Sequence, residues 1–424
     1  MSPLRLEHHR GRARIRGHGY FKRLGPGIIT GAADDDPSGI GTYSQVGAAY
    51  GLGLVWSTLL VAPMAAAVQE TAARLGLATG RGLATLIRER FPRPILYGAL
   101  ALTIGANTFN IGADIRSMAA ATRLVVAAPA ALLIVGFTGL MLGLELFVRY
   151  HRYSRILRWL ALSLLAYVFV LATVHVDWGD VAAHTFVPEI DGGKAALAAL
   201  IAVFGTTVSP YLFFWQASEE VEEEIDHRDR GEPVTDEHVD AMRVDVIGGM
   251  VSAVFVAFAI VVAAAATLNA NGITKIETAE QAARALKPVA GELAGLVFAL
   301  GIVGLGLLAV PVLAGSTAYA CAEAFGWREG LSRTFRQAPG FHLVLVASML
   351  VGLAMNVVGV SPIRALYVSA ILNGLAAPPI IVLMLLLGRS GDVVGDRRSG
   401  ALSVTIVGLT IVASVLAPVA YLLT

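Results

Sequence analysis

The sequence predicts an all-α polytopic membrane protein, and three observations support this prediction. Hydrophobic residues make up 56% of the 424-residue chain and charged residues only 15%, whereas soluble domains are about 25% charged. Eleven apolar stretches each approach the roughly 20 residues that a helix needs to cross a bilayer. The first and the sixth stretch are interrupted by proline at matching places. We therefore expect a 5+5 inverted repeat of two halves with opposite topology, followed by an eleventh helix.

The expected spans follow one another along residues 24–424, the predicted transmembrane domain. They lie at about residues 25–50, 52–75, 94–124, 127–149, 154–175, 194–217, 242–268, 290–322, 341–358, 362–388 and 401–422. Residues 24–190 form the first repeat in this prediction, residues 191–388 the second, and residues 401–422 the eleventh helix. Residues 1–23 form a basic arm without an apolar stretch of the signal-peptide kind.

Basic residues predict the orientation of these spans. The arm of residues 1–23 is rich in arginine and every second connection is also basic, whereas the other connections carry fewer basic residues. Because basic loops stay on the cytoplasmic side, we expect a cytoplasmic N-terminus and an outside C-terminus. The one cysteine, Cys321, excludes a disulfide framework and a cysteine-built metal site. A net charge of +1 gives no reason to expect nucleic acid as a partner.

Two tetrads interrupt the first and the sixth span, Asp36-Pro37-Ser38-Gly39 and Val208-Ser209-Pro210-Tyr211. Proline removes a backbone donor and glycine tolerates unusual dihedral angles, so each tetrad predicts a helix break that frees carbonyl groups. Irregular backbone at membrane depth is tolerated only around a cavity or a site. Interrupted segments at corresponding places in two halves indicate a secondary-transport site near the bilayer midplane.

Three consecutive acids, Asp34, Asp35 and Asp36, lie at the first break. A carboxylate at membrane depth costs roughly 2.5 to 3.5 kcal/mol on insertion scales, so these acids need water or partners. Adjacent helical side chains diverge by about 100°, so the three cannot all address one ligand. We favour Asp36 as the residue that contacts a substrate cation. Asp34 and Asp35 either flank the site in a solvated vestibule or carry a proton. Alternatively, Arg116 neutralises one of the three acids, and that acid then has a structural role.

Oxygen atoms dominate the donor set at the two breaks, because Cys, Met and His are absent near both. The side chains available there are those of Asp36, Ser38, Thr206, Thr207, Ser209 and Tyr211. Oxygen-only sets suit hard ions such as Mg²⁺, Mn²⁺ or Ca²⁺ better than copper, zinc or cadmium. Sodium with an organic substrate is also compatible with this donor set.

A polar stripe runs along the third span, and the tenth span adds an amide. Thr103, Asn107, Asn110 and Asp114 share one helix face. They either line a hydrated site or a proton relay, or they bond to neighbouring helices. In the tenth span, Asn373 precedes a proline kink, and its amide is a further candidate for the cavity.

Other charged clusters have simpler interpretations. The acidic run at residues 219–226 either draws cations toward an inner exit or forms a regulatory metal site with His227 and His238, but a solvated loop is the simpler prediction. Glu70 and Arg74, at i and i+4, predict a helical ion pair. The sequence has no phosphate-binding glycine loop, nucleophile elbow or HExxH motif, so it does not indicate an enzyme.

Four segments carry a resemblance to a known family. They are Leu24-Gly25-Pro26-Gly27, the tetrad that begins at Asp36, Tyr50-Gly51-Leu52, and residues 73–80 with the sequence ARLGLATG. Together they resemble the Nramp family of divalent-metal transporters. The resemblance implies a LeuT-type fold, alternating access, and a metal held between the unwound parts of the first and sixth helices. The metal is then transported substrate and not a cofactor, and we expect the plasma (inner) membrane of a prokaryote as the location.

The family's DPGN motif matches the first tetrad. The match keeps the metal-binding carboxylate at Asp36 and places Gly39 where the family has asparagine. By the same resemblance, the carbonyl ligands fall at Ala33 and Thr206.

The family's MPH motif matches the second tetrad. Ser209 stands in place of the methionine that selects soft transition metals, and Tyr211 in place of the histidine linked to proton movement. Without the sulfur ligand, the site loses its preference for soft ions. The smaller serine side chain also leaves room for water bound to the ion. This departure resembles the magnesium-transporting branch of Nramp relatives, with manganese as a close competitor.

We therefore expect a secondary transporter that moves a divalent cation, Mg²⁺ or Mn²⁺, into the cytoplasm by alternating access. The expected metal ligands are Asp36, Ala33, Thr206 and Ser209, and the expected pocket residues are Asp35, Ser38, Gly39, Thr207, Tyr211, Asn110, Asp114 and Asn373. The alternative with the same fold is a sodium- or proton-coupled symporter of a small organic solute. An intramembrane enzyme with two facing carboxyls and a cation channel with a continuous pore are alternatives from other classes. Proton coupling and oligomeric state stay open.

Overall fold

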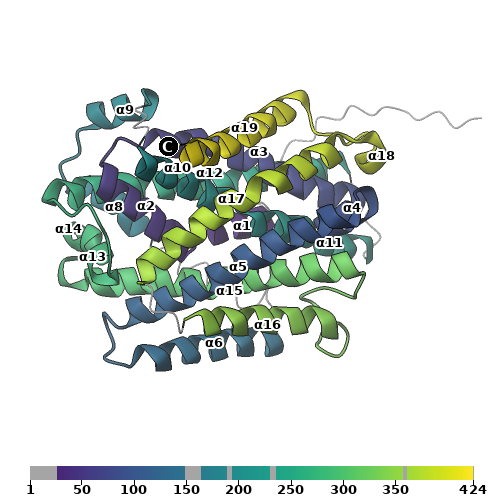
Figure 1. Ribbon diagram of the computed structural model, residues 1–424, viewed down its shortest axis with the longest axis horizontal. Helices are drawn as coiled ribbons and strands as arrows, with labels where there is room; N and C mark the ends of the chain where they lie inside the picture. Colours follow the sequence, from purple (N-terminus) through teal and green to yellow (C-terminus); the bar gives the residue numbers. More distant parts are fainter. Residues whose placement is uncertain (1–25, 149–163, 189–192, 230–234, 357–360, 424) are drawn as a thin grey trace, which may run out of the picture.

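The computed structural model describes residues 26–148, 164–188, 193–229, 235–356 and 361–423, and its regular structure in these ranges is entirely helical. Most of the long helices run along the long axis of the molecule (Figure 1). One end carries α9 (Trp178–Phe186), α13 (Ala279–Ala283) and α14 (Lys287–Ala290), and the other carries α4 (Leu83–Arg90) and α18 (Gly391–Val394). We call them the α9 end and the α4 end. The predicted all-α class is confirmed.

The remaining helices follow the predicted order of spans. Those of the first half are α1 (Pro26–Asp34), α2 (Pro37–Tyr50), α3 (Trp56–Thr79), α5 (Arg93–Thr122), α6 (Ala130–Phe147) and α8 (Leu165–Thr173). Those of the second half and the C-terminal segment are α10 (Lys194–Thr207), α11 (Pro210–Asp229), α12 (Asp236–Thr267), α15 (Ala294–Phe325), α16 (Pro339–Met355), α17 (Pro362–Arg389) and α19 (Ala401–Leu423). Short 3₁₀ turns lie at η3 (Asn269–Asn271), η4 (Arg284–Leu286) and η5 (Gly291–Leu293). The N-terminal part of the fifth predicted span falls outside the described residues.

Seven helical segments among the described residues are long and apolar enough to cross a membrane. They include α5, α6, α12, α17, α19, the run α10–α11 and the run from α13 through α15, and α16 is a shorter apolar helix. The first two predicted spans are not among the seven. We attribute this to the break between α1 and α2 and to the charged pair Glu70 and Arg74 within α3.

The predicted ion pair between Glu70 and Arg74 is confirmed, and both side chains are buried. Arg243 of α12 adds a second contact, with its Nε 3.1 Å from Oε1 of Glu70. The pair is therefore part of the seam between α3 and α12 as well as a link along one helix.

Glycine allows both broken helices to approach their neighbours closely. A Cβ atom on Gly31 of α1 would lie 2.4 Å from the carbonyl oxygen of Gly249 in α12, and one on Gly205 of α10 would lie 1.9 Å from that of Ala370 in α17. Only glycine fits at such separations. The helices that carry the two breaks are thus seated directly on the backbones of α12 and α17.

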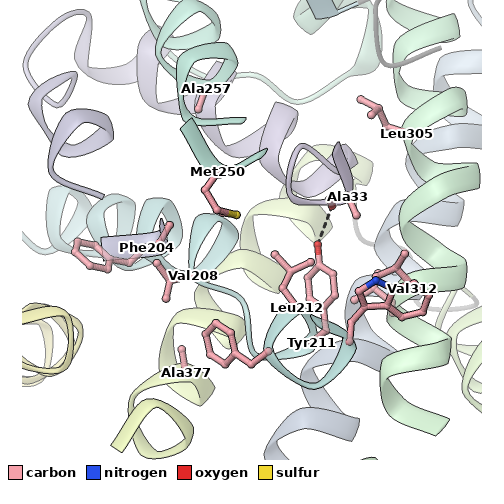
Figure 2. Packing of buried hydrophobic residues seen from close by; sticks show 14 of the residues in the cluster. Ala33, Phe204, Val208, Tyr211, Leu212, Met250, Ala257, Leu305, Val312 and Ala377 are labelled. Atoms are coloured by element: carbon pink, nitrogen blue, oxygen red, sulfur yellow. Dashed lines mark hydrogen bonds between the residues drawn. The ribbon is translucent and has the colours of Figure 1, made fainter. Parts of the chain in front are cut away.

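Apolar side chains from several helices enclose the region of the breaks (Figure 2). Met250 of α12, Leu305 and Val312 of α15, and Ala377 of α17 are all buried there. This packing excludes bulk water from most of the surroundings and leaves the polar atoms at the breaks as the distinctive chemistry of the core.

The prediction of a solvated acidic loop after the sixth span is wrong for its first part. Residues 219–223 continue α11, and Glu219 and Glu220 are buried with 3% and 4% of their surface exposed. The helix does not end where the apolar residues end. α11 packs against α3 and α15, and Tyr319 of α15 donates a hydrogen bond to Glu222 within this stretch. Glu223 is exposed, so the run passes from the interior to the surface. The side chains of residues 224–226 and of His227 lie outside the described part.

Candidate functional site

Both predicted helix breaks are confirmed. Asp35 and Asp36 separate α1 from α2, and Val208 and Ser209 separate α10 from α11. Asp36 has φ −63° and ψ 171°, and Val208 has φ −115° and ψ 62°, so both residues leave the helical region. A proline, Pro37 or Pro210, is the first residue of the helix that follows each break. At this position the backbone N–H has no acceptor within the helix, so the missing N–H of proline costs no hydrogen bond.

The two breaks meet in space although about 170 residues separate them in sequence. The hydroxyl oxygens of Ser38 and Thr206 lie 3.4 Å apart. The Tyr211 hydroxyl donates a hydrogen bond of 2.9 Å to the carbonyl oxygen of Ala33 (Figure 2). The structure therefore brings together one break from each half, as the repeat predicts.

Asp36 is the N-cap of α2, and its carboxylate is held by three hydrogen bonds. Oδ1 accepts from the backbone N–H of Gly39 at 2.7 Å and from the Ser38 hydroxyl at 2.6 Å. Oδ2 accepts from the Asn110 side-chain amide at 2.9 Å. Each carboxylate oxygen can accept about two bonds, so Oδ2 keeps acceptor capacity. A cation would meet Asp36 through Oδ2.

The other two acids of the triad are buried but play no such capping role. Asp34 is 2% exposed, and its Oδ1 has no hydrogen-bond partner among the described residues. Asp35 is 6% exposed. Arg116, the alternative partner, donates to the carbonyl oxygen of Asn356 at 3.1 Å, and no described ion pair joins it to the triad. Nowhere in the described ranges do three Asp, Glu, His or Cys side chains converge as a metal site, so the three acids do not address one ligand.

The polar stripe on α5 divides into two parts. Asn107 donates to Thr317 of α15 at 2.9 Å, which is the interhelical bonding that the simpler interpretation expects, and Thr103 bonds within its own helix. Asn110 instead reaches Asp36, and its Oδ1 has no partner in the described part of the chain. Asp114, one turn further, is fully buried with both carboxyl oxygens unpartnered there. Its carboxyl interacts electrostatically with that of Asp36.

Hydroxyl groups already occupy the two carbonyls expected as ligands. Ser209 donates to the carbonyl oxygens of Gly205 at 2.6 Å and Thr206 at 3.0 Å. Tyr211 donates to Ala33 in the same way. A carbonyl oxygen has two lone pairs, so each keeps one for another donor or for a cation.

Sequence reasoning missed Tyr43, which ties α2 to α10. The Thr207 hydroxyl donates to the carbonyl of Val203 at 2.9 Å, so the Tyr43 hydroxyl, 2.6 Å from Thr207 Oγ1, is the donor in that contact. The available signal was its spacing of seven residues from Asp36, which places both on one face of α2.

Asn373 lies near the second break but makes no described contact with the first. It is fully buried on α17, and neither atom of its amide has a partner among the described residues. The next residue, Gly374, packs against Ile201 and Gly205 of α10. Asn373 is therefore a neighbour of the site with unused donor and acceptor capacity.

The space beside Gly39, at the first break, is small. A Cβ atom on Gly39 would lie 3.3 Å from the Asp34 carbonyl oxygen and 3.4 Å from both Thr206 Oγ1 and a ring carbon of Tyr43. These are close or ordinary van der Waals distances. The space directly beside Gly39 therefore accommodates about one methyl group.

Solved structures define the class of this fold. The chain is similar to the manganese transporter of Eremococcus coleocola, solved as a point mutant, with a TM-score of 0.75, 20% identity, and coverage of 95% of this chain and 87% of that one. It is also similar to MhsT in complex with L-phenylalanine, with a TM-score of 0.65, 12% identity, and coverage of 95% and 97%. Identities this low show the fold alone. The fold is that of LeuT-type membrane transporters, which confirms the prediction.

The family follows from sequence. The profile of the family described as natural resistance-associated macrophage protein-like, or Nramp, matches residues 27–424, and the chain belongs to this family. A divalent metal cation transporter MntH from Deinococcus radiodurans is 29% identical, with 94% of this chain and 89% of that protein covered. Another MntH, from Yersinia enterocolitica, is 27% identical with 94% of each covered. The family transports metal, so the predictions that the chain is no enzyme and that metal is cargo are confirmed.

Proposed function

We propose that this chain carries a divalent metal cation through the membrane, bound at Asp36 between the two helix breaks, by alternating access. The observation that carries the proposal is the geometry of Asp36. Its carboxylate is 1% exposed, fixed by three hydrogen bonds, and placed where a break from each half meets. A fixed carboxylate with one oxygen still able to accept is a ready anionic ligand.

The oxygen chemistry around Asp36 supports Mg²⁺ or Mn²⁺ as the cargo. Asn110 Oδ1 and both oxygens of Asp114 have acceptor capacity that no described residue uses. Sulfur and imidazole ligands are absent from both tetrads. Amide, carbonyl and carboxylate oxygens suit hard cations. Because hydroxyls share the Ala33 and Thr206 carbonyls, an ion that keeps part of its water shell, as Mg²⁺ does, suits the site best.

The direction of transport rests on the distribution of charge. The α4 end holds the basic connections, among them Arg88 and Arg328, and the C-terminus lies away from α18 (Figure 1). The positive-inside rule then puts the α4 end in the cytoplasm and the C-terminus outside. We propose inward transport across the plasma membrane on this basis, with the repeat boundaries after residues 190 and 388 as predicted.

Proton coupling is a further part of the proposal. Asp34 and Asp114 are buried carboxyls without described partners near the cargo site, and such groups mark proton pathways in transporters. The alternative of a coupled carrier for an organic solute is supported less well, because the packing at Gly39 leaves little room.

The proposal is tested by uptake into proteoliposomes. Initial rates are measured for Mg²⁺, Mn²⁺, Ca²⁺ and Cd²⁺ with a pH dye inside, for the natural chain and Asp36→Ala. We expect saturable uptake of Mg²⁺ and Mn²⁺ with internal acidification, and its loss in the variant. Because removal of the N-cap alone costs about 1 kcal/mol, folding of the variant is checked by thermal unfolding. Saturable uptake that survives in folded Asp36→Ala would refute the ligand assignment.

A further inference from the structure

Three exposed aromatic rings form a stack at the α4 end, where the start of α5 and the end of α15 lie side by side (Figure 1). The ring centroid of Tyr97 in α5 lies 6.4 Å from that of Phe325, the last residue of α15. The ring centroid of Phe325 lies 5.1 Å from that of Trp327, and the interplanar angles of the two pairs are 29° and 26°. The three residues are 49%, 51% and 46% exposed in chain order, so this aromatic stack is a surface feature and not part of the core.

The aromatic stack continues an apolar, exposed side of α5. Ile95 and Leu102 are 40% and 41% exposed, and a Cβ atom on Gly98 or Gly105 would have no described neighbour within 4 Å. Since α5 is long and apolar enough to cross a membrane, this uncovered apolar side faces lipid. Tyrosine and tryptophan are enriched at the level of the lipid headgroups, because their rings are apolar and their tips are polar. We therefore place the aromatic stack at the level of the headgroups.

Two arginines beside the aromatic stack have no described counter-charge. Arg93 lies one turn before Tyr97 on the same face of α5, and Arg328 directly follows Trp327. Both arginines are exposed, and the side chain of neither makes a hydrogen bond or an ion pair with a described residue. The Tyr97 hydroxyl and the Trp327 indole N–H also lack an acceptor in the described part of the chain. The surroundings of the stack therefore offer positive charge and hydrogen-bond donors to an anion.

Arg88 of α4 lies beside the same rings but differs from these two arginines. A Cβ atom on Gly326, between the second and third ring residues in sequence, would lie 3.0 Å from Arg88 Nη1. Arg88 Nη1 donates to the carbonyl oxygen of Glu323, and its guanidinium interacts electrostatically with Glu329. Arg88 therefore joins α4 to the end of α15, and the uncompensated charge is that of the other two arginines.

We propose that Arg93, Arg328 and the aromatic stack bind the headgroup of an anionic phospholipid in the leaflet at the α4 end. Guanidinium groups bind phosphate oxygens through paired hydrogen bonds, and the polar tips of tyrosine and tryptophan donate to further headgroup oxygens. The acyl chains of the lipid then cover the apolar side of α5. Soluble phosphate would use the arginines but would leave the exposed rings in water, so a lipid fits this surface better. The site does not depend on which ion the central site carries.

The first test measures lipid binding by native mass spectrometry. The purified full-length chain is titrated with phosphatidylglycerol or with phosphatidylcholine of the same acyl chains, and we expect tighter binding of phosphatidylglycerol. Arginines at a membrane surface each attract anionic lipid, so Arg93→Gln/Arg328→Gln should weaken phosphatidylglycerol binding about thirtyfold, equal to about 2 kcal/mol. Arg93→Lys/Arg328→Lys keeps the charge and should lose less. Arg336→Gln removes another exposed arginine near the same end and should bind like the natural chain.

The second test concerns the rings. Tyr97→Phe/Trp327→Phe removes the hydroxyl and the indole N–H but keeps two aromatic rings in the stack. Because a hydrogen bond to a charged group contributes more than one between neutral groups, we expect phosphatidylglycerol to bind at least about fivefold more weakly. Inorganic phosphate in large excess should not displace the lipid from the natural chain, because it cannot cover the rings.

Three results would overturn the proposal. Phosphatidylglycerol that binds Arg93→Gln/Arg328→Gln as tightly as the natural chain would refute the role of the arginines. Equal binding of the two lipids by the natural chain would show that the surface does not select a headgroup charge. Displacement of the lipid by inorganic phosphate would assign the arginines to a soluble anion. Each variant is first compared with the natural chain by thermal unfolding in detergent without lipid, and equal Tm values confirm that it is folded.

Discussion

At the scale of single residues, the hydrogen bond from Tyr211 to the Ala33 carbonyl gives a direct test of the proposed cation site. Tyr211→Phe removes the hydroxyl that donates to Ala33 and keeps the ring. One hydrogen bond contributes about 1 kcal/mol, so we expect about fivefold tighter apparent binding of Mn²⁺ in uptake assays. The gain should be smaller for Mg²⁺, which keeps its water. Tyr43→Phe, which removes the contact with Thr207, is the matched control and should not improve Mn²⁺ binding.

Ser209 is the second residue with a direct prediction, because it stands where a sulfur ligand would favour soft ions. Ser209→Met removes the hydroxyl bonds to Gly205 and Thr206 and adds a thioether. We expect Cd²⁺ to compete with Mn²⁺ uptake at least about tenfold better than in the natural chain, a change of about 1.4 kcal/mol. Ser209→Ala removes the same hydroxyl without sulfur. An equal gain for Cd²⁺ in both variants would show that the thioether is irrelevant.

The sequence predicted Asp36 because a carboxylate beside a proline break has a local signature. Its role as N-cap and its bond to Asn110 depend on α5, which no local pattern specifies. Tyr43 was missed for the same reason. It looks like an ordinary helical residue until its partner from another helix, Thr207, is known.

At the scale of helices, the seam between α1 and α12 depends on glycine. Gly31→Ala places a methyl group where a Cβ atom would lie 2.4 Å from the Gly249 carbonyl oxygen. Overpacking of this kind typically costs about 1–3 kcal/mol, so we expect a lower Tm in detergent. Gly248→Ala adds the same methyl group to α12 where nothing lies within 4 Å, and its Tm should stay unchanged or rise. Equal Tm values for the two variants would contradict the tight seam.

The connection between α15 and α16 gives a prediction for pH. Burial raises the pKa of Glu329 from its ordinary 4.5 to about 9, with Glu323 and Glu222 nearby adding to the effect. The folded state therefore holds this proton more tightly than the unfolded chain. Its stabilising contribution is complete below about pH 4.5 and is lost as the pH rises through 9. The Tm of Glu329→Gln should fall less than that of the natural chain between pH 6 and 9, and parallel curves would contradict this.

Helix boundaries could be predicted where the composition of the sequence changes. They could not be predicted where packing against other helices determines where a helix ends. The breaks were found because proline and polar residues interrupt apolar runs. The end of the sixth span was misplaced because Glu219 and Glu220 look like a solvated loop, yet α11 continues through them against α3 and α15. An acidic run inside a packed helix is recognisable only from the tertiary structure.

At the scale of the whole molecule, the repeat was visible through matched breaks and helix count. The bond between Tyr211 and Ala33 and the contact between Ser38 and Thr206 then join the two halves at one place. The fold can be predicted from these matched helix breaks. The identity of the transported ion cannot, because selectivity for one metal ion over another depends on which oxygen atoms are free to bind it. Hydrogen bonds between helices determine which oxygen atoms are free.

The central claim is that Asp36 carries a hard divalent cation between the two breaks. It is tested most directly by initial rates of Mg²⁺ and Mn²⁺ uptake for Asp36→Asn, which keeps an oxygen that can cap α2 but removes the charge. The exposed Asp392→Asn is the control with the same change. We predict that Asp36→Asn loses saturable uptake of both ions while Asp392→Asn keeps it. Saturable uptake by folded Asp36→Asn at the rate of the natural chain would contradict the claim.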